Sequence, residues 1–257
     1  MYTKHKILLL HGMGGKGSLF RPLIALLEDS CDVLAPDQIG HGTQRDYQGP
    51  VTPSDFGHHI CETLKTFHPC IGVGHSMGVR SLLAAAALKP DFFSALILID
   101  LGVSGVPSHH TQLEKLFMGM PEVFENKQHA KDYLDAMCPD VGIKQYLMAS
   151  CAPYQGGMMF GFHPHTMLRI IDTLRTTNTL KEAQSLAASG MPMYFLRGGN
   201  STVLSEKQFL DEQELIQGAQ THWMTIPDTG HGLPFDQKKK LADLLLSIAQ
   251  NRRIHND

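Results

Sequence analysis

The stretch Gly74-His75-Ser76-Met77-Gly78 lies between a short apolar run, Ile71–Val73, and an alanine-rich segment that continues to Leu88. The run predicts a buried strand and the segment predicts a helix, so Ser76 stands on a sharp strand-to-helix turn. Glycines suit such a turn, because a side chain at either flanking position would clash with the strand or the helix. The turn would expose the serine hydroxyl and direct the Met77 N–H, at a helix N-terminus, toward a developing oxyanion. A chance G-x-S-x-G is the alternative, and the strand–turn–helix context disfavours it.

Short apolar runs alternate with helix-length segments along the rest of the chain. The runs are Ile7–Leu10, Val33–Ala35, Ile71–Val73, Ala95–Ile99, Met193–Leu196 and Trp223–Ile226. Their brevity and apolar character are typical of strands buried on both faces of a parallel sheet. The alternation predicts an α/β domain with helices on both faces of that sheet.

One interval, between Ile99 and Met193, is far too long to be a loop. Its pattern predicts amphipathic helices over residues 112–125, 129–137 and 166–185. We therefore expect an α/β core formed by residues 1–106 and 187–257, with a helical segment, residues 107–186, inserted in it.

Composition narrows the functional classes. The 257 residues are 42% hydrophobic and 18% charged, with a net charge of −3. These values predict a globular chain with a substantial core and no strong attraction to nucleic acid. No apolar run approaches the ~20 residues that span a bilayer, and the run at residues 7–10 is too short for a signal peptide. The five cysteines are odd in number and form no C-x-x-C, which predicts thiols in a reducing compartment, the cytoplasm.

A second glycine-rich stretch, His11-Gly12-Met13-Gly14-Gly15, follows the first predicted strand. Such a loop can bring another backbone N–H, that of Met13, to the same oxyanion. Phosphate binding is the competing interpretation, but neither G-x-x-x-x-G-K-[ST] nor G-x-G-x-x-G is present.

A third stretch, Thr229-Gly230-His231-Gly232, lies between the last predicted strand and the last helix. A general base must be able to take up and pass on a proton near neutral pH, as imidazole does. His231 also lies at the carboxyl end of a strand, where open parallel sheets bind their ligands.

Together these stretches resemble the α/β-hydrolase superfamily, and the resemblance covers essentially the whole chain. It includes Asp37-Gln38-Ile39-Gly40-His41-Gly42, which is similar to the structural D-x-x-G-H-G turn of that family. The resemblance implies an α/β-hydrolase fold of about six mainly parallel strands with helices on both faces and a helical cap insertion. It also implies Ser76 as nucleophile, His231 as base, and the N–H groups of Met13 and Met77 as oxyanion donors. It implies no cofactor and no metal.

The triad acid does not stand at its usual position. After the penultimate core strand the chain reads Arg197-Gly198-Gly199-Asn200-Ser201-Thr202, which contains no carboxylate. Asp100 instead ends the preceding strand, where some members of the superfamily carry the acid. We expect Asp100 to orient His231 and stabilise its imidazolium. The alternative is that Asn200 or a water molecule does so.

The resemblance points to a serine hydrolase that cleaves a carboxylic ester or thioester through an acyl-enzyme. Met and Phe side chains are frequent in the insertion and suit a pocket for a small substrate with an apolar acyl or alcohol group. C–C bond hydrolysis, acyl transfer and a non-catalytic receptor for a small ligand remain as alternatives. His163-Pro164-His165 and His109-His110 have no Asp, Glu or Cys beside them at ligand spacing, so no metal is expected.

Overall fold

The main sheet decides where a site can form. The computed structural model describes residues 4–105 and 110–250, and the sheet's order is β2-β1-β3-β4-β7-β8. Every neighbouring pair of its six strands runs parallel, which confirms the predicted fold class. The strands are β1 His5–Leu10, β2 Cys31–Leu34, β3 Cys70–His75, β4 Phe93–Ile99, β7 Met193–Gly198 and β8 Thr221–Ile226.

The strand order reverses between β1 and β3. The chain passes from β1 outward to β2 and then returns to place β3 on the other side of β1. Open parallel sheets bind ligands at the carboxyl ends of their strands beside such a reversal. The loops that follow β1 and β3 are the two glycine-rich stretches of the sequence, so the topology brings them side by side.

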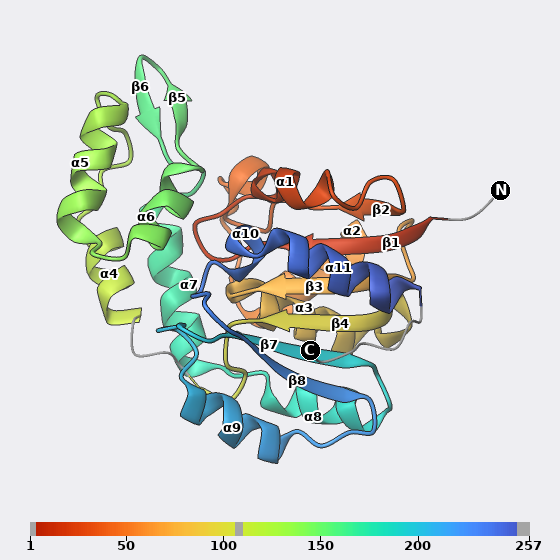
Figure 1. The fold of residues 1–257 in the computed structure, drawn as a ribbon. Helices are drawn as coiled ribbons and strands as arrows, with labels where there is room; N and C mark the ends of the chain where they lie inside the picture. The colour runs from red at the N-terminus through yellow and green to blue at the C-terminus, as the bar shows by residue number, and fades with distance from the viewer. Residues whose placement is uncertain (1–3, 106–109, 251–257) are drawn as a thin grey trace.

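Two helical layers cover the sheet (Figure 1). Leu8 and Leu10 of β1 face one layer and Ile7 and Leu9 face the other, as alternation along a strand requires. The first layer contains α2 (Pro53–Thr63), α3 (Met77–Leu88), α8 (Leu180–Ala188) and α9 (Glu206–Leu215). The second contains α1 (Arg21–Ile24), α10 (Leu233–Asp236) and α11 (Lys238–Ala249).

The inserted segment, which runs from α4 to α7 between β4 and α8, lies beyond the carboxyl ends of the strands, at the left of Figure 1. It is larger than the predicted set of helices, since α6 and a small hairpin were not expected. Its elements are α4 His110–Met118, α5 Lys127–Met137, α6 Val141–Met148, β5 Ala152–Tyr154, β6 Gly157–Met159 and α7 Pro164–Thr176. Its apolar cluster, which includes Phe117 and Phe160, also contains Ile39 and Met77 of the core.

The single helix predicted over residues 166–185 is wrong, because the chain forms α7 and α8 with a break between them. Thr177, the residue after α7, has extended backbone angles of −125° and 153°. Buried Arg80 of α3 donates to the carbonyls of Leu174 and Thr177 at 3.0 and 2.7 Å. These bonds satisfy carbonyls at the end of α7 that a continuous helix would have used, and they fix the end of α7 to α3.

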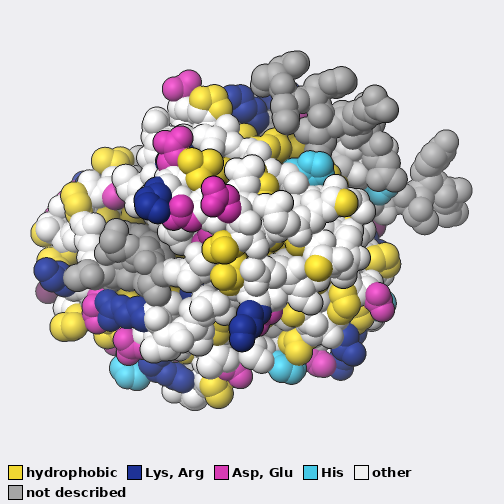
Figure 2. Space-filling model, turned by 90° about the horizontal axis from the view of Figure 1, so that it is seen from below, with side chains coloured by type: hydrophobic (Ala, Val, Ile, Leu, Met, Phe, Trp, Pro, Cys, Tyr) yellow, Lys and Arg dark blue, Asp and Glu magenta, His cyan; other side chains and the backbone are white. Residues whose placement is uncertain are grey.

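Within residues 4–105 and 110–250, no helix has both the length and the apolar character needed to cross a bilayer. On the face shown in Figure 2, Lys and Arg side chains are interspersed with Asp and Glu side chains. The described residues on that face therefore present no continuous basic stripe of the kind that binds nucleic acid.

Candidate active site

Ser76 has a strained backbone between β3 and α3. Its φ is 53° and its ψ is −124°, a combination that L-residues rarely adopt. The surrounding structure fixes it, because the Ser76 N–H donates to the Ile99 carbonyl of β4 at 2.9 Å. A Cβ atom at Gly78 would lie 2.5 Å from the Leu10 carbonyl oxygen, so only glycine lets α3 approach β1 this closely. The serine side chain is thereby presented at the sheet's carboxyl edge.

Asp100 and His231 are in direct contact at that edge. His231 Nδ1 lies 2.8 Å from Asp100 Oδ2, and Asp100 is completely buried. Since an ionised carboxylate only accepts, Nδ1 carries the hydrogen and the neutral ring leaves Nε2 as the proton acceptor. The Asn200 side chain has no hydrogen bond to His231 in the described part of the chain. The Asn200 backbone N–H donates to the Thr229 carbonyl at 2.8 Å.

Two further donors hold the Asp100 carboxylate. The Gly198 N–H donates to Oδ1 at 2.9 Å and the Ser201 hydroxyl to Oδ2 at 2.5 Å. Burial alone would raise the pKa of Asp100, but the hydrogen bond and charge of His231, with the bonds from Ser201 and Gly198, hold that pKa below its usual value. The group is therefore an anion at neutral pH, as a residue that stabilises an imidazolium must be.

His75, beside the serine, supports the loop that carries His231. Its Nε2 lies 2.8 Å from the His231 carbonyl oxygen, so Nε2 carries the hydrogen and donates. Burial and the neighbouring His231 lower the pKa of His75 to about 3, which keeps the ring neutral. Its sequence position gave no sign of this contact, because the two residues are brought together only by the pairing of β3, β4, β7 and β8.

The two expected oxyanion donors lie on adjacent loops. Met13 follows β1, and Met77 is the first residue of α3, where backbone N–H groups have no partner within the helix. A Cβ atom at Gly12 would lie 3.0 Å from Ser76 Cβ, which shows how closely the loops approach. Met13 and Met77 both line the cavity that Ser76 lines, so their role as oxyanion donors stays a prediction.

One cavity of about 490 Å³ connects these groups, a size that suits a small molecule. Ser76, His231, Met13, Met77 and Asn200 line it from the core. The segment between β4 and β7 supplies a mainly apolar wall, formed by Leu113, Phe117, Ile143, Tyr146, Leu147 and Leu174. Sequence patterns did not single out Tyr146, since α6 itself was not expected.

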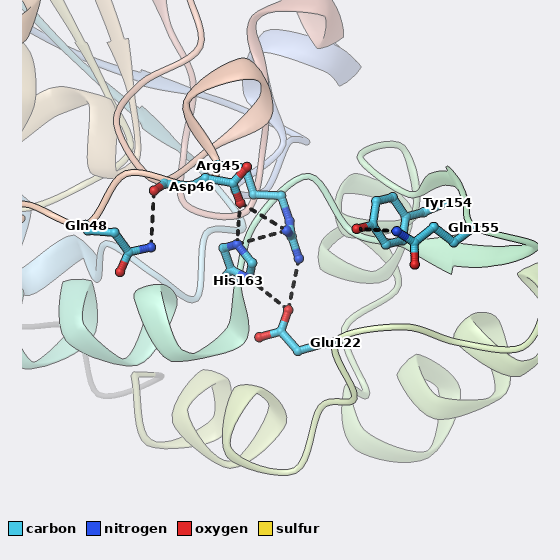
Figure 3. A network of polar contacts seen from close by, with 7 residues as sticks. All are labelled: Arg45, Asp46, Gln48, Glu122, Tyr154, Gln155 and His163. Atoms are coloured by element: carbon cyan, nitrogen blue, oxygen red, sulfur yellow. Dashed lines mark hydrogen bonds and ion pairs between the residues drawn. The ribbon is translucent and has the colours of Figure 1, made fainter.

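His163, from one of the two histidine pairs considered for metal binding, takes part in a network of charged side chains. Residues 4–105 and 110–250 contain no group of three or more His, Cys, Asp or Glu side chains arranged to hold a metal ion. His163 lies among Arg45, Asp46 and Glu122, where the Arg45 guanidinium supplies the positive charge (Figure 3). His109 and the side chain of His110 lie outside the described residues.

Comparison with known proteins identifies the family. A match to the alpha/beta hydrolase family spans residues 7–244. The chain belongs to the alpha/beta hydrolase family. It is an enzyme of that hydrolase class, which confirms the resemblance drawn from its motifs. The solved structure of E-2-(acetamidomethylene)succinate hydrolase superposes with a TM-score of 0.82 at 20% identity, covering 97% of this chain and 92% of that one.

Some curated relatives of this alpha/beta hydrolase are named as lipases or esterases. It is 25% identical to the mouse sn-1-specific diacylglycerol lipase ABHD11, over 96% of its own length and 81% of the relative's. It is 24% identical to the esterase YbfF of Escherichia coli strain K12, over 90% and 87% of the two lengths. At these identities the names suggest a reaction class rather than a substrate.

Proposed function

We propose that this alpha/beta hydrolase is a serine esterase that cleaves a carboxylic ester or thioester bearing an apolar acyl or alcohol group. One observation about the cavity carries the proposal. Ser76, on a strained turn, shares a cavity with a histidine whose Nδ1 lies 2.8 Å from a buried carboxylate. That set of groups activates a hydroxyl for attack on a carbonyl.

The first half of the reaction acylates the enzyme. His231 Nε2 takes the Ser76 proton as Oγ bonds to the carbonyl carbon, and the N–H groups of Met13 and Met77 bind the oxyanion. Asp100 stabilises the imidazolium that results. The tetrahedral intermediate collapses as His231 returns the proton to the leaving alcohol or thiol, which departs with the electrons of its bond to the carbonyl carbon.

The second half releases the acid. His231 takes a proton from a water molecule as the water oxygen attacks the acyl carbon. The proton then passes from His231 to Ser76 Oγ when the bond between Oγ and the acyl carbon breaks. A carboxylic acid leaves and the serine is restored. Every step uses side chains or N–H groups of this chain, and none calls for a metal or cofactor.

The proposed substrate class rests on the cavity wall. Leu113, Phe117, Ile143 and Leu147 present apolar surface to the cavity that Ser76 lines, and burial of each CH₂ of an acyl chain contributes about 0.8 kcal/mol. We propose that α4 to α7, within the expected insertion of residues 107–186, serve as a cap that closes this wall over the substrate, while α8 packs on the sheet. The lipase and esterase names of relatives support ester cleavage over C–C cleavage or acyl transfer.

The compartment is part of the proposal. All five cysteines are free thiols, and Cys31, Cys70 and Cys138 are buried. A reducing compartment accounts for unpaired thiols in this number, so we propose a cytoplasmic location.

Removal of the serine hydroxyl tests the function. Ser76→Ala should keep the fold and lower the turnover of p-nitrophenyl esters by at least about 10⁴-fold. Ser81→Ala, a buried serine on the same helix, is the matched control and should retain activity. Ester turnover that persists in Ser76→Ala would contradict the mechanism, and a wild type that binds esters without cleaving them would favour a receptor.

A further inference from the structure

The Gly12 carbonyl, directly before Met13, accepts three hydrogen bonds. Its donors are the Tyr146 hydroxyl at 3.0 Å, the Gly15 N–H at 3.1 Å and His11 Nδ1 at 2.9 Å. Gly12 and Gly15 of this turn are buried, and three donors on one carbonyl are more than that oxygen, with its two lone pairs, requires. The three hydrogen bonds together fix the orientation of this peptide group.

The Gly12 carbonyl and the Met13 N–H belong to the same peptide group. In a trans peptide the C=O and N–H bonds point in opposite directions and lie in one plane. Holding the carbonyl oxygen therefore fixes where the Met13 N–H points, which is toward the side of the loop opposite the three donors. A rotation of this peptide would remove an oxyanion donor without moving Ser76 or His231.

Two of the three donors are set within the core. His11 is completely buried, and its Nε2 accepts the Gln38 N–H at 3.1 Å, so its hydrogen is on Nδ1. Burial lowers the pKa of His11 to about 4, which keeps this tautomer neutral. The Gly15 N–H belongs to the turn itself.

Tyr146 differs from the other two because it comes from α6, in the inserted segment, 134 residues along the chain. Its ring packs against Phe235, with centroids 5.5 Å apart, and against the edge of His75. Burial raises the pKa of the Tyr146 hydroxyl, so it stays protonated and remains a donor.

We propose that Tyr146 is a positioning residue for the oxyanion hole. Its hydroxyl completes the clamp on the Gly12 carbonyl and thereby aligns the Met13 N–H, so that the hole is fully aligned only when α6 is seated on the loop after β1. The inserted segment then contributes to transition-state stabilisation as well as to the pocket wall. This inference rests on the proposed function, in which the Met13 N–H binds the oxyanion.

Tyr146→Phe tests the inference, because it removes the hydroxyl and leaves the ring that packs on Phe235. The expected result is a fall in kcat for a p-nitrophenyl ester of about tenfold to a hundredfold, with KM changed less than about twofold. Affinity for a trifluoromethyl ketone, which forms a tetrahedral oxyanion adduct on the serine, should fall by a similar factor. A role in packing alone would lower the melting temperature without this parallel loss.

Tyr133→Phe is the matched control. Tyr133 is also a tyrosine of the inserted segment whose hydroxyl donates to a backbone carbonyl, that of Leu116 at 2.6 Å, but it does not line the cavity. Its kcat, KM and ketone affinity should stay within about twofold of wild type.

The outcomes separate this inference from the function on which it rests. If Tyr146→Phe has the kcat and ketone affinity of wild type while Ser76→Ala is inactive, the positioning role is overturned and the esterase assignment stands. A rise in KM with unchanged kcat would also overturn it, since Tyr146 would then contact the bound substrate instead. A wild type that neither hydrolyses esters nor binds the ketone would remove the proposed function and this inference together.

Discussion

The sheet edge and the segment inserted between β4 and β7 form opposite walls of one cavity, by different physical means. At the sheet edge, buried polar groups are held by several hydrogen bonds each, as at Asp100 and the Gly12 carbonyl. The inserted wall is mostly apolar and contributes a single hydroxyl to these networks. The difference teaches that strand ends hold polar groups in fixed backbone geometry, whereas the inserted segment shapes the cavity mainly by the packing of apolar side chains.

Asp100→Asn should give the largest loss on the sheet side. The amide would favour the wrong imidazole tautomer of His231, so kcat is expected to fall by up to roughly 10⁴-fold while the fold persists. Steady-state kinetics with a melting curve would check it. Asn200→Ala is the matched comparison and should have little effect; the reverse pattern would assign the orienting role to Asn200.

Acidic pH should lower the free energy of unfolding, because three buried histidines lie near the sheet edge. Burial is the largest cause that lowers the pKa of His11 to about 4 and of His41 and His75 to about 3. In the unfolded chain imidazole titrates near 6.5, so between about pH 6.5 and 4 the unfolded state binds more protons and stability falls as pH falls.

The free energy of unfolding should then decrease by up to about 1.4 kcal/mol per pH unit for each of these three groups. Urea denaturation at a series of pH values would measure it. His41→Asn should flatten the profile relative to wild type. A stability that is constant from pH 7 to 4.5 would show that these rings are protonated in the folded state.

On the inserted side the expected effects are smaller and concern substrate choice. Leu113→Ala should widen the apolar wall, weaken binding of medium-chain esters by several-fold and shift preference toward longer chains. Met118→Ala is a control on the same helix, since Met118 is 68% exposed. Kinetics over a series of p-nitrophenyl esters of graded chain length would check both variants, and an unchanged preference in Leu113→Ala would mean that the acyl group lies elsewhere.

The smallest effect is expected where the two regions meet at the surface. Arg45 of the core and Glu122 of the inserted segment form an ion pair at 2.9 Å, and the Glu122 side chain is 53% exposed. Because solvent screens such a pair, Glu122→Gln should lower the free energy of unfolding by less than about 1 kcal/mol. A larger loss in urea denaturation would show that this network fixes the inserted segment to the core (Figure 3).

The same contrast explains what the sequence could predict. The strands and the residues at their ends are read from short apolar runs followed by glycine, serine or aspartate, which constrain the backbone locally. The contacts of His75 with the His231 loop and of Ser201 with Asp100 were missed, because they depend on strands far apart in sequence. The break at Thr177 was missed because a buried arginine from α3 imposes it.

Tyr146 shows the limit most clearly. No local pattern distinguishes it from other tyrosines, and its contact with Gly12 exists only because α6 packs over the loop after β1. The position of a functional group in an inserted segment depends on how that segment packs on the core. Hydrophobic periodicity in the sequence does not predict that packing.

The most direct test of the central claim, that Ser76 is a nucleophile activated by His231 and Asp100, is mass spectrometry of the protein after reaction with a fluorophosphonate. One adduct per chain is expected, on the peptide that contains Ser76. No adduct is expected in Ser76→Ala, and much slower labelling is expected in His231→Ala. An adduct on a different residue, or ester hydrolysis that continues after Ser76 is fully labelled, would contradict it.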